Sequence, residues 1–179
     1  MIKDDLKKIL VSEKEIIERC EQLGKQLDKD IAAMRNPVLF VGILKGSVPF
    51  MAELIKHIDS DIEMDFMAVS SYSGTESVGD IKIIKDLDHS IKGRDLVLVE
   101  DIVDTGTTIK ELKKLLYNKG AHEIKVVTLL DKPSRRKVDI EADYTGFEVE
   151  NEFVVGFGLD YNQRYRNLPY IGVLKEELY

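Results

Sequence analysis

The chain has 179 residues, of which 44% are hydrophobic and 33% charged, and it carries a formal net charge of −7 with a pI near 5.1. This length and composition predict one globular domain with a substantial core and exclude a disordered or fibrous chain. The acidic balance argues against nucleic acid as the main partner, because phosphate backbones favour basic surfaces.

The first ten residues, MIKDDLKKIL, contain no apolar segment of the kind found in signal peptides. The one cysteine, Cys20, cannot form an internal disulfide, so nothing indicates an oxidising compartment. No apolar run approaches the roughly 20 residues needed to cross a bilayer. We therefore expect a cytoplasmic protein with no membrane partner.

The amino-terminal third of the sequence predicts a helix, a buried strand and a second helix. Ser12 to Glu15 fit a capping box, and apolar residues follow at helical spacing as far as Ile31. The continuous apolar run VLFVGIL at residues 38–44 is typical of a strand buried on both faces of a parallel sheet. The second helix follows, with Pro49 tolerated in its first turn.

Strands and one more helix alternate through the rest of the chain. A polar segment at residues 70–80 is too long for a tight hairpin turn, and a third helix is expected to end near Gly120. Further strands are predicted at residues 62–69, 81–87, 96–99, 124–130, 144–149 and 153–157. This alternation predicts an α/β fold with a doubly wound, mostly parallel twisted sheet flanked by helices. Ligands of such sheets bind beyond the carboxyl ends of the strands.

The segment VEDIVDTGTT at residues 99–108 lies at such a strand end and opens the third helix. Residues 104–108 form a polar loop whose N–H groups and hydroxyls can hold a phosphate, and the helix dipole adds about 0.3–1 kcal/mol. Vicinal ribose hydroxyls, together with a divalent cation, would suit Glu100 and Asp101. The other interpretation is a simple helix cap, for which Asp and Thr are favoured. No Walker A pattern and no complete dinucleotide fingerprint occurs in the sequence.

VEDIVDTGTT resembles the phosphoribosyl-pyrophosphate-binding motif of the type I phosphoribosyltransferases. From about residue 38 to residue 166, further segments resemble the hypoxanthine (hypoxanthine-guanine) phosphoribosyltransferases in the same order. The resemblance implies the type I phosphoribosyltransferase fold in a single domain over residues 1–179. Its core would span about residues 36–140, and a small hood would combine the N-terminal helix with about residues 141–179.

The resemblance also implies a role for each part of the 99–108 segment. Glu100 and Asp101 would hold the ribose hydroxyls, and Asp104 would act near N7 of the base as general base or acid. The 5′-phosphate would be held by Thr105, Gly106, Thr107 and Thr108. Magnesium would be ligated by the carboxylates of Glu100, Asp101 and Asp160, since hard cations prefer oxygen ligands.

Residues outside this segment would complete the site. By the same resemblance, Lys45 and Gly46 in the segment LKGS and Arg166 in RYRNL bind pyrophosphate, and the Leu44–Lys45 peptide bond is expected to be cis. Ser71 and Tyr72 would belong to a loop that closes over the pyrophosphate and excludes water.

The base would be bound by residues near the carboxyl end of the chain. Lys132 would donate to the 6-oxo group, Phe153 would stack on the purine, main-chain groups of Val154 would contact its edge, and Asp160 would lie beside it. The basic run at residues 135–137 is expected to be a solvated loop face.

The implied function is purine salvage by transfer of a 5-phosphoribosyl group to hypoxanthine, and to guanine, in a magnesium-dependent homodimer or homotetramer. One alternative is a regulator that binds phosphoribosyl pyrophosphate without catalysis. Another is an enzyme that prefers xanthine, or one that acts on pyrimidines with a secondary RNA-binding role. Retention of Asp104, Lys132 and Phe153 argues against the regulator, and the match FVVGFGLDYN favours 6-oxopurines.

Overall fold

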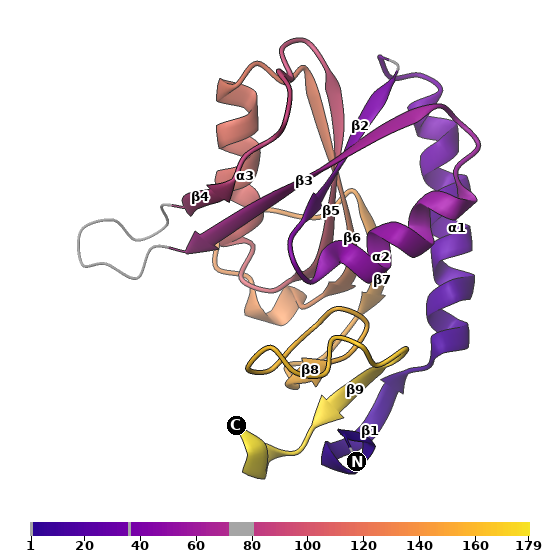
Figure 1. Ribbon diagram of the computed structural model, residues 1–179, viewed down its shortest axis with the longest axis vertical. Helices are drawn as coiled ribbons and strands as arrows, with labels where there is room; N and C mark the ends of the chain where they lie inside the picture. The colour runs from indigo at the N-terminus through magenta and orange to yellow at the C-terminus, as the bar shows by residue number, and fades with distance from the viewer. Residues whose placement is uncertain (1, 36, 72–80) are drawn as a thin grey trace.

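A six-stranded sheet forms the centre of the computed structural model, which describes residues 2–35, 37–71 and 81–179 (Figure 1). Its strands are β2 (Val38–Ile43), β3 (Ile62–Ser71), β4 (Ile81–Lys85), β5 (Asp95–Val103), β6 (Glu123–Asp131) and β7 (Tyr144–Glu148). In space they follow the order β4-β3-β2-β5-β6-β7, and all neighbours run parallel except β4, which is antiparallel to β3. The predicted mostly parallel sheet is confirmed.

Two apolar cores lie on opposite faces of this sheet. In β2, Phe40 belongs to the core that contains helices α1 (Glu13–Ile31) and α2 (Ser47–Leu54). Val41 belongs to the core that contains helix α3 (Thr107–Asn118). Figure 1 shows α1 and α3 on opposite sides of the sheet. Since successive strand residues point to opposite faces, the unbroken apolar run of β2 fills both cores.

Helix α1 begins with the predicted capping box. The Glu15 N–H donates to Ser12 Oγ over 3.3 Å, and the Ser12 N–H donates to Glu15 Oε2 over 2.8 Å. The apolar face of the helix is fully buried and packs near α2 and β7. None of the helices in the described ranges is long and apolar enough to cross a membrane.

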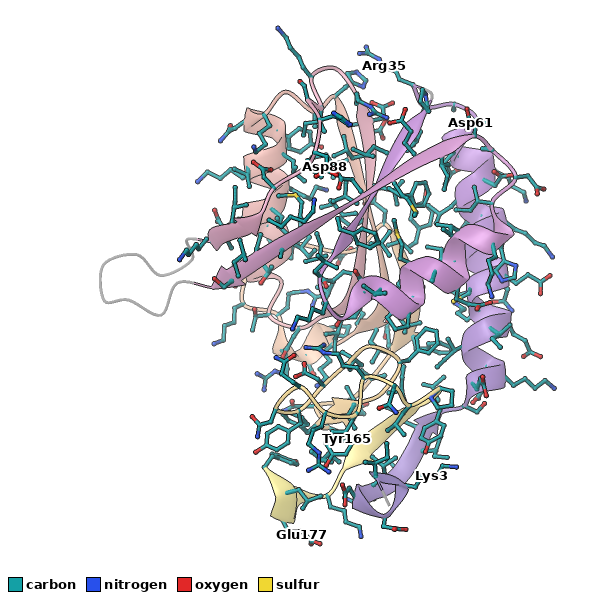
Figure 2. All side chains as sticks on the ribbon, in the orientation of Figure 1. Lys3, Arg35, Asp61, Asp88, Tyr165 and Glu177 are labelled. Atoms are coloured by element: carbon teal, nitrogen blue, oxygen red, sulfur yellow. The ribbon has the colours of Figure 1, made fainter. Side chains whose placement is uncertain are left out.

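A smaller antiparallel sheet lies at the end of the molecule that holds both termini (Figure 1). It consists of β1 (Leu6–Val11), β9 (Ile171–Leu174) and β8 (Val154–Val155), in the order β1-β9-β8. We call this sheet, together with the loop of residues 156–170, the hood. Tyr165 lies in that loop (Figure 2), and its hydroxyl donates to Asp5 Oδ2 over 2.8 Å, which ties the loop to the amino-terminal segment.

The division between core and hood differs from the predicted one. Helix α1 packs against the main sheet through its apolar face, and β7 pairs in parallel with β6, so both belong to the core. The N-terminal contribution to the hood is β1 instead.

Strands β1 and β9 were not predicted. Strand β1 is half exposed and contains two lysines, so its apolar pattern is weak. Short 3₁₀ turns occur at Ile2–Asp5, Ile55–His57, Pro133–Arg135 and Glu176–Leu178.

Strand β5 extends beyond its apolar run. Its pairing with β6 continues through Glu100↔Thr128 and Ile102↔Leu130, so the acidic pair at residues 100–101 lies within the strand and not in the following loop. Main-chain pairing holds this part of the chain straight although its side chains are polar. The acidic residues are consequently placed by the sheet itself.

Cys20 is expected to be unreactive in the folded protein. Its side chain is fully buried, and this burial, with a smaller effect from the charge of Glu53, raises the pKa of the thiol to about 12. Because the thiolate is the reactive form, a thiol reagent such as 5,5′-dithiobis(2-nitrobenzoate) should label the native protein only as fast as it unfolds. One equivalent should react at once in urea. Rapid labelling of the native protein would contradict the buried placement.

Candidate functional site

A cavity of about 570 Å³ lies at the carboxyl ends of β5 and β6, where the main sheet meets the hood. This is the end of a parallel sheet at which ligands bind. We call it the large cavity. Six residues predicted for the site line it: Asp101, Asp104, Lys132, Phe153, Val154 and Asp160. The prediction did not include Ile102, Arg135, Asn151, Glu152, Leu159 and Tyr179, which also line it.

A second cavity of about 200 Å³, the small cavity, adjoins the first at the start of α3. It is lined by Glu100, Thr105, Gly106 and Thr108 among others, and Ile102 and Asp104 line both cavities. Gly106 has a φ of +81°, in the left-handed region that glycine adopts without strain, and this turn starts α3 at Thr107. The strand end, the turn and the helix N-terminus therefore surround one cavity with polar and aliphatic walls, at the place where the sequence predicted a phosphate.

Glu100 and Asp101 are carboxyl groups taken largely out of water. Burial raises the pKa of Glu100 well above its ordinary value, and the neighbouring charge of Asp101 raises it further. Burial also raises the pKa of Asp101, against the opposing effect of hydrogen bonds such as that from the Ile102 N–H to Oδ1 over 2.7 Å. Burying such groups costs free energy unless they are paired, so this acidic pair is a favourable place for a cation or for hydroxyl donors.

Gly46 packs directly against the acidic pair. A Cβ at this position would overlap Oδ2 of Asp101, so only glycine lets the turn approach the carboxylate. The preceding Leu44–Lys45 peptide bond is cis, as the resemblance implied. Lys45 Nζ lies 3.3 Å from Gln163 Oε1 in the hood. The turn after β2 therefore contacts both the acidic pair and the hood.

Lys132 is buried although it follows directly on a strand end. Its side chain points into the large cavity, where Nζ donates to the main-chain oxygen of Glu152 over 2.7 Å. Burial lowers the pKa of the ammonium group. In the described part of the chain this is the one acceptor of Nζ, so the buried lysine keeps donors for a ligand carbonyl group.

Phe153, which lines the large cavity, belongs to a cluster of three aromatic rings. Phe153 is stacked on Tyr179 with centroids 4.5 Å apart and planes at 25°, and Tyr161 meets Phe153 edge-on at 5.5 Å. The sequence identified Phe153 alone, because the C-terminal segment reaches it only through the folding of β9. Phe153 and Tyr179, which both line the large cavity, offer a flat ligand an apolar surface.

The loop of the hood that carries Asp160 and Arg166 has an unusual backbone. Within the described part of the chain, every non-glycine residue with positive φ lies here: Phe157, Asn162, Gln163 and Tyr165. Such conformations cost free energy and concentrate at functional sites. Arg166 Nη2 lies 2.9 Å from Asp160 Oδ1, and Nη1 donates to the main-chain oxygen of Gly158 over 2.7 Å. The charge of Arg166 also lowers the pKa of Asp101, so the loop faces the acidic pair.

The basic run at residues 135–137 is only partly a solvated loop face, since Arg135 and Lys137 are exposed but Arg136 is not. Arg135 Nε lies 2.6 Å from Asp104 Oδ1, and the Arg136 side chain is only 15% exposed and bonds to Asp131 and to main-chain oxygens. The expectation was wrong for Arg136, because a charge run at a strand end gives no sign of which partners the tertiary fold brings to it.

Within the described residues, neither the predicted metal ligands nor the predicted closing loop forms a complete group. Among residues 2–35, 37–71 and 81–179, no three His, Cys, Asp or Glu side chains gather closely enough to hold a metal by themselves. Ser71 is the last residue of β3, and Tyr72 lies outside the described residues. Their assignment to a closing loop stays a prediction.

Comparisons with known proteins match almost the whole chain. The family described as phosphoribosyl transferase domain matches residues 8–162. The hypoxanthine-guanine phosphoribosyltransferase of Streptococcus pneumoniae is 61% identical, with 100% of this chain and 99% of that protein covered. Its counterpart from Streptococcus thermophilus is 58% identical with the same coverage.

Solved structures agree with the sequence matches. A hypoxanthine phosphoribosyltransferase from Staphylococcus aureus has a TM-score of 0.94 at 53% identity, covering 99% of this chain and 96% of that one. The hypoxanthine phosphoribosyltransferase from Trypanosoma cruzi, solved with the product IMP, has a TM-score of 0.93 at 38% identity, with 98% of each chain covered.

Proposed function

This chain belongs to the phosphoribosyltransferase family, and we propose that it transfers the 5-phosphoribosyl group of 5-phosphoribosyl pyrophosphate to hypoxanthine and guanine. The products are the purine nucleoside 5′-monophosphate and pyrophosphate, so the enzyme serves purine salvage. The observation that carries the proposal is the pair of adjoining cavities, which share Ile102 and Asp104. One suits a flat base and the other suits a phosphate.

The large cavity is proposed to bind the base. Lys132 would donate a hydrogen bond to the 6-oxo group, and its buried ammonium favours a carbonyl oxygen over an exocyclic amine. Phe153 would stack on the purine, and main-chain groups of Val154 would contact its edge. A regulator that only senses phosphoribosyl pyrophosphate would not need these residues, so the intact base side favours the enzyme.

The ribose, 5′-phosphate and pyrophosphate groups are proposed to bind at the end of β5, the start of α3, the turn after β2 and the loop of the hood. Glu100 and Asp101 would hold the ribose hydroxyls, while the α3 start from Thr105 to Thr108 would hold the 5′-phosphate. Lys45, Gly46 and Arg166 would bind pyrophosphate. Arg166 supports this role because its Nε is buried without a hydrogen-bond partner in the described structure, and a planar guanidinium suits phosphate oxygens.

The carboxylates also fit magnesium. Glu100, Asp101 and Asp160 offer only oxygen ligands, and Mg²⁺ is commonly held by one or two carboxylates together with substrate phosphates and water. The absence of a three-ligand group in the described ranges is compatible with that mode. When bound, the cation would neutralise charge on the leaving pyrophosphate.

The transfer exchanges one bond at C1 of the ribose for another. The bond to the pyrophosphate oxygen breaks and its electron pair leaves with pyrophosphate, while a bond forms from N9 of the purine to C1. Asp104 would accept the proton that the purine loses at N7. The hood borders this position, and Ser71 and Tyr72 would close over it and keep water from the reacting sugar.

The function predicts a pattern of base use that can be measured directly. Pyrophosphate release from 5-phosphoribosyl pyrophosphate with magnesium should occur with hypoxanthine and with guanine, and should be absent with adenine and uracil, which lack a 6-oxopurine edge. Omission of the base is the control for hydrolysis. Turnover with xanthine in preference to hypoxanthine would revise the base assignment. Binding of phosphoribosyl pyrophosphate without turnover on any base would contradict the enzyme and support the regulator.

Assembly and location are further parts of the proposal. The resemblance to the family supports a homodimer or homotetramer in the cytoplasm. Sedimentation velocity of the purified protein would measure the oligomeric state.

A further inference from the structure

The loop after β6 runs alongside the segment that carries Asp104. Three consecutive main-chain oxygens of that segment accept hydrogen bonds from residues 132–137. Val103 O accepts from the Lys132 N–H over 2.9 Å and from Arg136 Nη1 over 3.1 Å. Asp104 O accepts from Arg136 Nη1 over 2.6 Å, and Thr105 O accepts from the Lys137 N–H over 3.0 Å.

Arg136 fixes the main chain of this segment. Its guanidinium also binds Asp131 Oδ1, and Nε donates to the main-chain oxygen of Ile140 over 3.0 Å. A Cβ on Gly106 would press against the side chains of Arg136 and Ile140, so the two loops are packed as well as hydrogen-bonded. The backbone on either side of Asp104 is therefore held in place by a largely buried side chain.

Arg135 holds the Asp104 side chain. Nε lies 2.6 Å from Asp104 Oδ1, and Nη1 lies 3.3 Å from Asn151 Oδ1. Arg135, Asp104 and Asn151 all line the large cavity. The guanidinium thus spans from one wall of this cavity to another, and it engages only one of the two carboxylate oxygens. Within the described part of the chain, Oδ2 of Asp104 accepts no hydrogen bond.

We propose that Arg135 is a positioning residue of the phosphoribosyl transfer, holding Asp104 by Oδ1 so that Oδ2 meets the N7 proton of the purine. The proposal rests on the function proposed above. A carboxylate at the end of a rotatable side chain would otherwise adopt several orientations, and a misplacement of about 1 Å can cost 10²-fold in rate. Asn151 supplies the second anchor, which a guanidinium can use because it is planar and carries several donors.

The exposure of this pair makes the proposal testable without loss of the fold. The Arg135 side chain is 42% exposed and that of Asp104 is 40% exposed. Ion pairs of this kind stabilise a fold very little. An effect of Arg135 on turnover would therefore not reflect unfolding, and the urea midpoint of each variant provides the check.

The test is steady-state kinetics of Arg135→Gln and Arg135→Lys with hypoxanthine. Arg135→Gln should lower kcat by about 10- to 100-fold while KM for phosphoribosyl pyrophosphate stays unchanged. Arg135→Lys should recover part of the loss, since it keeps the charge but cannot bridge Asp104 and Asn151 in the same way. The matched control is Arg94→Gln, because Arg94 pairs with Glu63 over 2.9 Å at the amino ends of the strands and should not affect kcat.

A double-mutant cycle decides whether Arg135 acts through Asp104. In a protein that already carries Asp104→Asn, Arg135→Gln should lower kcat no further, because the carboxylate it positions is gone. Additive losses, or an unchanged or increased kcat in Arg135→Gln alone, would overturn the proposal. Wild-type turnover is the independent test of the proposed function. Failure of the proposed function can therefore be told apart from failure of the role proposed for Arg135.

Discussion

Asp104→Asn is expected to lower kcat for hypoxanthine by about 10²- to 10⁴-fold, the usual contribution of a positioned general base. The amide has nearly the shape of the carboxylate but cannot accept the N7 proton. Because Asp104 is 40% exposed, the fold should keep its stability. Binding of phosphoribosyl pyrophosphate, measured by isothermal titration calorimetry, should also be retained, since the amide keeps the shape of Asp104 in the small cavity and leaves α3 and Gly106 unchanged.

The matched control is Asp139→Asn, which removes the same charge from an exposed side chain on the neighbouring loop. It should leave kcat unchanged. Equal losses in the two variants would assign the effect to net charge. Full activity of Asp104→Asn would remove Asp104 from the chemistry and leave it only as a contact in the cavity.

Gly158→Ala should destabilise the protein by about 2–5 kcal/mol, because it adds backbone strain to a steric overlap. Gly158 has a φ of +100°, where an L side chain is strained, and its Cβ would collide with the main-chain oxygen of Gly46. The collision would separate the hood from the turn after β2, so activity should fall together with stability. Urea unfolding followed by circular dichroism measures the free energy of unfolding.

Gly93→Ala separates the effect of backbone strain from the effect of steric overlap. Gly93 also has a positive φ, +75°, but nothing lies within 4 Å of the position of its Cβ. This variant should therefore lose only about 1–2 kcal/mol from the strained backbone and keep its kcat. If Gly158→Ala is no less stable than Gly93→Ala, the close approach of the hood to the turn after β2 is not present in solution.

The main sheet could be predicted because its strands are buried on both faces. Residues 38–43 are apolar without interruption, and a short run of this kind is characteristic of a strand covered on both sides. The hood could not be predicted in the same way. Strand β1 contains two adjacent lysines and lies on a half-exposed surface, so it lacks a clear apolar pattern, and β8 spans only Val154–Val155. Those strands exist because distant segments pair, which is a tertiary effect that local patterns do not contain.

The functional site, too, could be predicted only in part. The 99–108 segment could be recognised because its residues are consecutive. Carboxylates followed by Gly and Thr at the start of a helix form a specific motif. Arg135 and Tyr179 were missed because each acts through a partner far away in the sequence, Asp104 for the first and Phe153 for the second. A charge run and a terminal tyrosine are common on protein surfaces, so only the fold shows that these two line the large cavity.

The pairing of β1 with β9 has a consequence for synthesis of the protein. A ribosome delivers Leu6–Val11 early and Ile171–Leu174 late, and at about 5–20 residues per second the first strand waits roughly ten to thirty seconds for its partner. The main sheet can form during that wait, because all its strands precede residue 149. The loop with Asp160 and Arg166 is secured only when β9 arrives. Nascent chains should thus bind phosphate groups before they can bind a purine and transfer the phosphoribosyl group to it. Turnover should begin only after β9 has left the ribosome.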